Sequence, residues 1–131
     1  MKKLSLLLVL ILSMSSMSFA QKNKTEVLYF KAPLSCCQAR ACDALEADIK
    51  SIIENNYKDG SVVFKVVKTN DQNNKQLVEK YKAKSQTVVI EKTKRKKTKS
   101  IDVSDIVRKY TRSKDKVALE NDLINAIKKS F

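Results

Sequence analysis

The chain has 131 residues, and its 27 lysines and arginines against 14 aspartates and glutamates give a formal net charge of +13. It contains no histidine, which excludes imidazole base catalysis and histidine metal ligation. The single glycine and single proline indicate regular helices and strands instead of a loop-rich fold stapled by disulfides. Its three cysteines cannot all pair within one chain, so the sequence predicts a free thiol, an intermolecular disulfide or a bound soft ion.

The N-terminus has the pattern of a secretory signal. Two lysines precede an apolar segment over residues 4–12, and Ser18 and Ala20 stand at the small-residue positions that a signal peptidase needs. We therefore expect residues 1–20 to be a signal peptide that is cleaved after Ala20, and residues 21–131 to form one domain. No later stretch reaches the ~18 apolar residues that a membrane-spanning helix needs. The sequence thus predicts an exported protein, periplasmic or secreted, without a transmembrane helix in the mature chain.

The first elements of the mature chain are a strand and a long helix. Residues 27–30 form a short continuous apolar run, which is typical of a strand covered on both faces. Pro33 then keeps the chain extended. Between residues 38 and 57 apolar residues recur at spacings of three and four, which predicts an amphipathic helix with one buried stripe. The stripe consists of Cys42, Leu45, Ile49, Ile52 and Ile53.

The rest of the chain alternates strands and helices and then ends in two helices. The expected elements are a strand over 62–67, a helix between 70 and 84, strands over 87–90 and 99–103 joined as a hairpin, a helix from Ser104, and a final amphipathic helix. Right-handed crossovers would make the first three strands parallel and the fourth antiparallel at one edge. We therefore predict an α/β domain whose central mixed sheet of about four strands is flanked by helices.

This order of elements resembles the thioredoxin-like fold over most of residues 21–131. Two positions depart from that family's pattern. Ala39 stands three residues before Cys42, where a C-x-x-C motif would have its first cysteine. Residues 84–87, which precede the third strand, lack the cis-proline of the fold. The pattern is also similar to small exported thioredoxin-like proteins known as the nitrophenyl-compound nitroreductase subunit of arsenic-resistance clusters.

All three cysteines follow the first strand, at the end of the sheet where ligands bind in α/β folds. Their C-C-x4-C spacing, Cys36, Cys37 and Cys42, resembles the arsenic metallochaperone family. The resemblance implies that three thiols bind trivalent arsenic or antimony and pass it to a partner protein. Arg40 and a nearby helix N-terminus would favour the thiolate forms, and a loop containing Pro33 would position the vicinal pair.

The ion and the chemistry stay open at this point. Zinc prefers four ligands, and copper(I) is also thiophilic, so both remain alternatives to arsenic or antimony. No tightly bound cofactor is expected. A second reading is thiol–disulfide exchange, in which Cys36 or Cys37 attacks and Cys42 resolves, and the partner is then a redox protein. A third reading is a non-catalytic thioredoxin-fold adaptor. We expect no catalytic turnover by this chain alone.

Helix geometry bears on these alternatives. If Cys37 and Cys42 both lay in one helix, their Cα atoms would be ~8.6 Å apart. A disulfide needs less than ~7 Å, so that pair could not close on an intact helix. If Cys36 and Cys37 instead lay in a loop folded back over the first turn, all three sulfurs would surround one point.

The positive charge is concentrated in the basic run over residues 92–99, which carries no aromatic side chain. Single-stranded nucleic acid is usually bound by stacking rings beside basic residues, so we do not expect nucleic acid as a partner. An anionic membrane surface or an acidic partner protein is compatible with the run. The simplest alternative is a solvated hairpin tip kept soluble by lysine.

Overall fold

The computed structural model describes residues 23–130, without the side chain of Cys36. The predicted signal peptide, residues 1–20, lies outside the described residues. Within 23–130, no helix has the length and hydrophobicity needed to cross a membrane.

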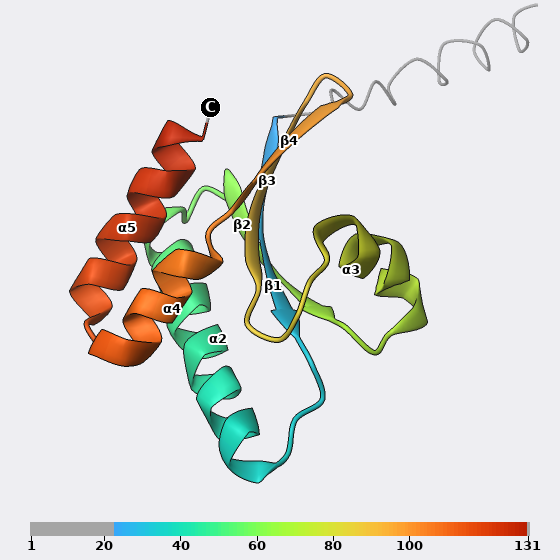
Figure 1. Ribbon diagram of the computed structural model, residues 1–131. Helices are drawn as coiled ribbons and strands as arrows, with labels where there is room; N and C mark the ends of the chain where they lie inside the picture. Colours follow the sequence, from blue (N-terminus) through green and yellow to red (C-terminus); the bar gives the residue numbers. More distant parts are fainter. Residues whose placement is uncertain (1–22, 131) are drawn as a thin grey trace, which may run out of the picture.

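Each predicted strand and helix is present (Figure 1). The elements are β1 (Lys24–Lys31), α2 (Cys36–Asn56), β2 (Val62–Lys68), a 3-10 turn (Gln72–Asn74), α3 (Lys75–Tyr81), β3 (Val88–Lys94), β4 (Lys97–Asp102), α4 (Ser104–Ser113) and α5 (Lys116–Lys129). The long helix begins two residues before the predicted residue 38. The helix expected between 70 and 84 is divided, because Asp71 caps a 3-10 turn before α3 starts.

The sheet has the order β2-β1-β3-β4. β1 and β2 are parallel, whereas β3 is antiparallel to β1 and β4 is antiparallel to β3. The prediction of three parallel strands is therefore wrong for the third strand. α3 has 7 residues and is only about 10 Å long. A strand of 7 residues such as β2 spans about 23 Å, so α3 cannot carry the chain back along it. The chain enters β3 from the end at which it leaves β2.

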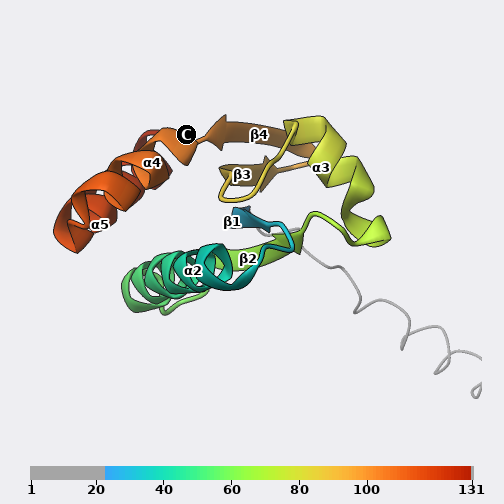
Figure 2. The same cartoon turned by 60° about the horizontal axis from the view of Figure 1, so that its bottom comes forward.

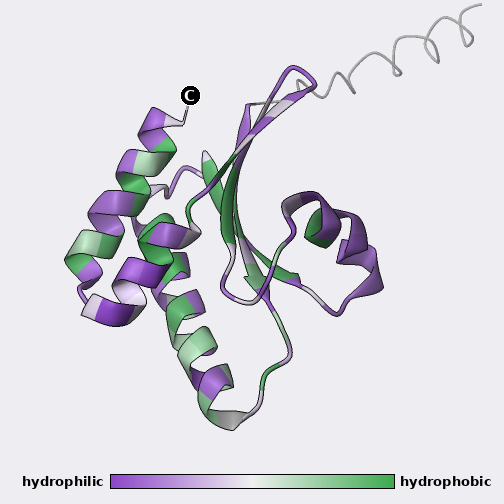
Figure 3. Cartoon of the chain, viewed as in Figure 1, coloured by the Kyte–Doolittle hydropathy of each residue, from purple (hydrophilic) through white to green (hydrophobic). Residues whose placement is uncertain are grey.

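The helices cover both faces of the sheet (Figure 2). One face packs against α2, α4 and α5, and the other packs against α3. Alternate residues of β1 serve the two faces: Val27 and Tyr29 belong to the larger cluster, and Leu28 and Phe30 to the smaller one. Because both faces of β1 are covered, its consecutive residues are apolar. In Figure 3 the hydrophobic colour accordingly follows the centre of the sheet and the inner sides of the helices, whereas the β3–β4 hairpin is largely hydrophilic.

The predicted stripe of α2 is buried over its whole length. Its members are exposed by 9% or less: Cys42, Leu45, Ile49, Ile52 and Ile53. Asp48, beside this stripe, joins the helices to one another. Tyr110 of α4 donates a hydrogen bond of 2.6 Å to Asp48, and Lys116 of α5 forms an ion pair of 2.7 Å with it. The hydrogen bond to Asp48 and burial raise the pKa of Tyr110 to about 12.

The predicted fold class is confirmed. Over residues 23–130 the chain is a single α/β domain with a four-stranded mixed sheet and four α-helices, consistent with a thioredoxin-like arrangement.

Candidate functional site

The three cysteines lie in the first two turns of α2, which leaves the carboxyl end of β1 through the short connection that contains Pro33. Ser35 precedes the helix with an extended backbone, and its side chain makes no capping hydrogen bond. The Ser35 carbonyl accepts hydrogen bonds from the backbone N–H groups of Gln38 and Ala39. Cys36 and Cys37 are therefore helical. The backbone does not adopt the folded-back loop that would bring all three sulfurs together.

Helical geometry separates the three cysteine positions. Residues one, five and six positions apart lie about 100°, 140° and 120° apart around a helix axis. Cys36, Cys37 and Cys42 thus occupy three sides of α2. Among residues with described side chains, which leave out Cys36, no group of three or more Cys, Asp or Glu is arranged to hold a metal ion. A site that uses all three cysteines would require the first turn of α2 to open.

The two cysteines with described side chains differ in environment. Cys37 is an exposed free thiol, whereas Cys42 is a free thiol with only 2% of its surface exposed. Both cysteines lie within α2, and two residues five positions apart in a helix have their Cα atoms ~8.6 Å apart. A disulfide between them cannot close while the helix is intact.

Two polar side chains contact the Cys42 sulfur. The side-chain amide of Gln86 donates a hydrogen bond to Cys42 Sγ at 3.3 Å. Ser85 Oγ lies 3.6 Å from the same sulfur. Both residues belong to the loop that leads from α3 into β3. Cys42 is therefore enclosed by the helix that carries it and by a loop more than 40 residues further along the chain.

The backbone holds this loop against β1. The Gln86 N–H donates to the Phe30 carbonyl, and the Phe30 N–H donates to the Thr87 carbonyl, both at 2.9 Å. Gln86 has a φ of +66°, a left-handed conformation that is uncommon for residues with side chains. Neither Ser85 nor Gln86 was predicted as a site residue. Their segment is notable in the sequence only because it lacks the cis-proline of the thioredoxin-like fold.

Tyr29 links the sheet to the same helix. Its hydroxyl, buried in the core, donates a hydrogen bond of 3.1 Å to the backbone carbonyl of Cys42. Burial, and then the neighbouring Cys42 thiol, hold the pKa of Tyr29 well above its usual range. Tyr29 therefore remains a hydrogen-bond donor at neutral pH.

Lys31, the last residue of β1, forms ion pairs with two acidic residues near the start of α2. Its ammonium group lies 2.6 Å from Asp43 and 2.7 Å from Glu46. The hydrogen bonds to Asp43 and Glu46 raise the pKa of Lys31. Pairs this close to solvent contribute at most about 1 kcal/mol each, so they orient α2 more than they stabilise it. Arg40 and Pro33, the predicted supporting residues, are both exposed.

No protein-family model and no curated protein matches the chain. Among solved structures, the chain is similar to one described as that of a malarial protein. The two share 25% sequence identity over 83% of this chain and 99% of that chain, with a TM-score of 0.49.

Proposed function

We propose that this protein binds trivalent arsenic or antimony through the thiolates of Cys36, Cys37 and Cys42. The observation that carries the proposal is the position of all three cysteines in the first two turns of α2, at the carboxyl end of β1. Trivalent arsenic and antimony are soft and prefer three thiolates in a pyramid. Zinc and copper(I) are the alternative ions for the same sulfurs.

Binding through all three sulfurs requires the first turn of α2 to open, and several features support a low cost for this step. Ser35 provides no side-chain cap, which usually contributes about 1 kcal/mol. Residues 36–41 precede the buried stripe, and Cys37, Gln38 and Arg40 among them are exposed. Opening this segment would uncover Cys42 and let the vicinal pair fold back toward it.

A titration of the reduced domain, residues 21–131, with arsenite tests the proposal. We expect one arsenic per chain, loss of three free thiols, a rise in thiolate–arsenic absorbance and a small loss of helical circular dichroism. Cys36→Ser, Cys37→Ser and Cys42→Ser should each abolish three-coordinate binding. Ala41→Ser, an exposed change in the same segment that keeps every thiol, is the matched control and should bind normally. Saturable binding that survives Cys42→Ser would contradict the three-thiolate site.

A second candidate function is thiol–disulfide exchange, and the exposure of Cys37 on the first turn of a helix favours it. Unpaired backbone N–H groups at a helix N-terminus stabilise a thiolate. The Cys37 thiolate would attack a partner's disulfide, form a mixed disulfide and release the partner's other sulfur as a thiolate. This reaction should survive Cys36→Ser, whereas three-thiolate binding should not. A non-catalytic adaptor, the third candidate, would keep its cellular activity after all three cysteines are changed to alanine.

We also propose that the protein is exported, since residues 1–20 have the sequence pattern of a signal peptide. N-terminal sequencing of the protein recovered from the periplasm or the culture medium should begin at Gln21. Recovery of uncleaved protein from the cytoplasm alone would contradict export.

A further inference from the structure

The hairpin formed by β3 and β4 has one strongly basic face. Lys92 pairs with Lys99, and Lys94 pairs with Lys97. Because side chains alternate between the two faces of a strand, these four lysines share a face. They line a hollow together with Arg95 of the turn. We call these residues and Lys96 the polybasic hairpin: Lys92, Lys94, Arg95, Lys96, Lys97 and Lys99.

The positive charges and the residues of the turn make the hairpin less stable. Like charges directly opposite each other in a sheet are destabilising, and this ladder contains two such pairs. The turn residues Arg95 and Lys96 have φ values of +45° and +67°. A two-residue turn of this kind favours Asn and Gly, because side chains are strained there. Lysines can also protect an edge strand from aggregation, but that role explains β4 and not a basic pair in a left-handed turn.

The opposite face of the hairpin is neutral by comparison. Thr93 and Thr98 pair across the strands with their hydroxyl oxygens 3.1 Å apart. Glu91 on this face forms an ion pair of 2.7 Å with Lys80 of α3. Residues 92–99 contain no acidic residue. The charge is thus directed to one side, as expected for a surface that meets an anionic partner.

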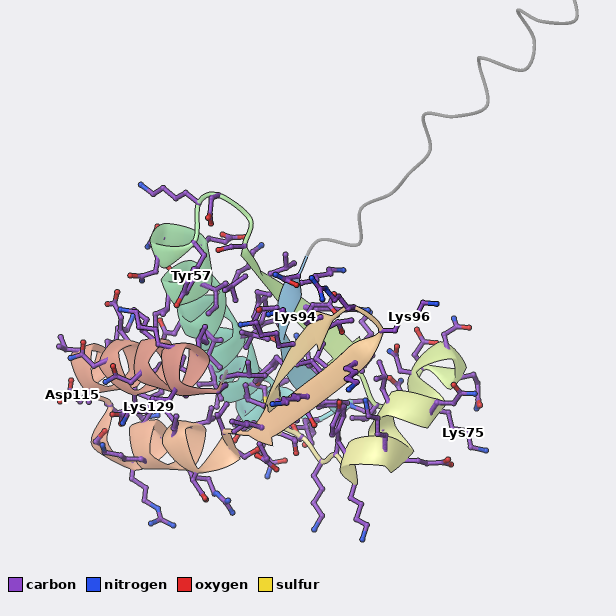
Figure 4. All side chains as sticks on the ribbon, turned by 90° about the horizontal axis from the view of Figure 1, so that it is seen from above. Tyr57, Lys75, Lys94, Lys96, Asp115 and Lys129 are labelled. Atoms are coloured by element: carbon purple, nitrogen blue, oxygen red, sulfur yellow. The ribbon has the colours of Figure 1, made fainter. Side chains whose placement is uncertain are left out.

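The polybasic hairpin lies at the opposite end of the sheet from the cysteines (Figure 1). Lys24, the first residue of β1, is paired with Thr93 near the turn, whereas Tyr29 is paired with Val88 near the thiol end. The two ends are separated by the length of β1, 8 residues or about 26 Å. Figure 4, seen from above the hairpin, shows Lys94 and Lys96 on it. The sequence before β1, with its apolar segment at residues 4–12, joins the domain at this same end.

We propose that the polybasic hairpin binds the phosphate groups of anionic phospholipids at a membrane surface. Clustered lysines and arginines are attracted to anionic headgroups, and each contributes about fivefold to the partition coefficient. The hairpin carries no aromatic side chain on which bases of nucleic acid would stack. Membrane binding through the hairpin would direct the cysteine end away from the lipid, and it does not depend on what the thiols bind.

Vesicle co-sedimentation tests this proposal with the domain of residues 21–131. The wild-type protein should bind vesicles of phosphatidylcholine mixed with phosphatidylglycerol, should not bind phosphatidylcholine alone, and should dissociate as salt is added. Changing four hairpin residues to glutamine, Lys94→Gln, Arg95→Gln, Lys96→Gln and Lys97→Gln, should lower the partition coefficient about 10²–10³-fold.

The matched control removes four positive charges from exposed positions outside the hairpin: Lys58→Gln, Lys75→Gln, Lys82→Gln and Arg112→Gln. We expect the control variant to keep its partition coefficient within about threefold of wild type, since these residues lie outside the contact. Thermal melting of both variants verifies that they are folded. An equal loss of binding in both variants would show that net charge alone is responsible and would overturn the proposal. Equal binding of wild type to neutral vesicles would also overturn it.

Discussion

The two ends of the sheet are built from opposite kinds of interaction. At the carboxyl end of β1, Cys42 is enclosed in the core and held by hydrogen bonds from Tyr29 and Gln86. At the other end the polybasic hairpin is exposed, its cross-strand pairs repel and its turn is strained. Burial and hydrogen bonds therefore determine the stability of the thiol end, whereas charge repulsion, which salt screens, determines that of the hairpin end. Perturbations of these two kinds should affect the two ends differently.

The largest difference is expected from truncating one apolar side chain at the thiol end and one on β4 of the hairpin, where Ile101 pairs with Ile90. Leu45, one turn after Cys42, is 2% exposed, whereas Ile101 of β4 is 40% exposed. Leu45→Ala removes buried contacts and leaves a cavity, so it should lower the free energy of unfolding by about 3 kcal/mol. Ile101→Ala should lower it by less than about 1 kcal/mol. Urea denaturation measures both values, and similar losses would refute the contrast between the ends.

A change in the hairpin turn should raise stability while it weakens membrane binding. Arg95→Asn with Lys96→Gly places the preferred residues in the left-handed turn and removes two charges. We expect the free energy of unfolding to increase by about 1–2 kcal/mol. Binding to anionic vesicles should fall about 25-fold, since each basic residue contributes about fivefold.

The control for this change is Lys82→Asn, which relaxes another left-handed residue at the end of α3. It should stabilise the protein without changing vesicle binding. If Lys82→Asn weakened binding as much as the turn variant, the contact could not be assigned to the hairpin.

The smallest expected effect concerns Tyr29 at the thiol end. Tyr29→Phe removes the hydrogen bond to the Cys42 carbonyl and should cost about 1 kcal/mol at neutral pH. The folded protein holds the pKa of Tyr29 above the value near 10 that tyrosine has in an unfolded chain. Above pH 10 the unfolded state therefore loses this proton first, and stability falls as the pH rises.

Urea denaturation between pH 8 and pH 11 should show a shallower alkaline loss of stability in Tyr29→Phe than in wild type (the pH range spans the usual tyrosine pKa, about 10). Tyr110, whose pKa is raised to about 12, contributes to the same loss, so some pH dependence should persist. An unchanged alkaline slope would mean that Tyr29 does not contribute to it.

Local sequence patterns were sufficient to predict the strands, the helices and the buried stripe of α2. The orientation of β3 was not predictable from its own residues, because it depends on whether the short α3 can span the sheet. At the thiol end, too, some residues could be predicted from local sequence and others could not. The cysteines were identified from their spacing, but Ser85 and Gln86 were missed, since they contact Cys42 from 43 and 44 residues away. Such contacts follow from the topology, which local periodicity does not encode.

The hydrogen bond from Tyr29 to the Cys42 carbonyl marks the point in α2 at which we expect amide hydrogen exchange to change. Amides of residues 36–41, which precede this bond and the buried stripe, should exchange with solvent through local opening of the first turn. From Leu45 onward the helix is packed against the sheet, and its amides should exchange only when the whole domain unfolds. The amides of the first turns of α2, which carry Cys36 and Cys37, should therefore exchange faster than those of the rest of the helix, which starts near Cys42.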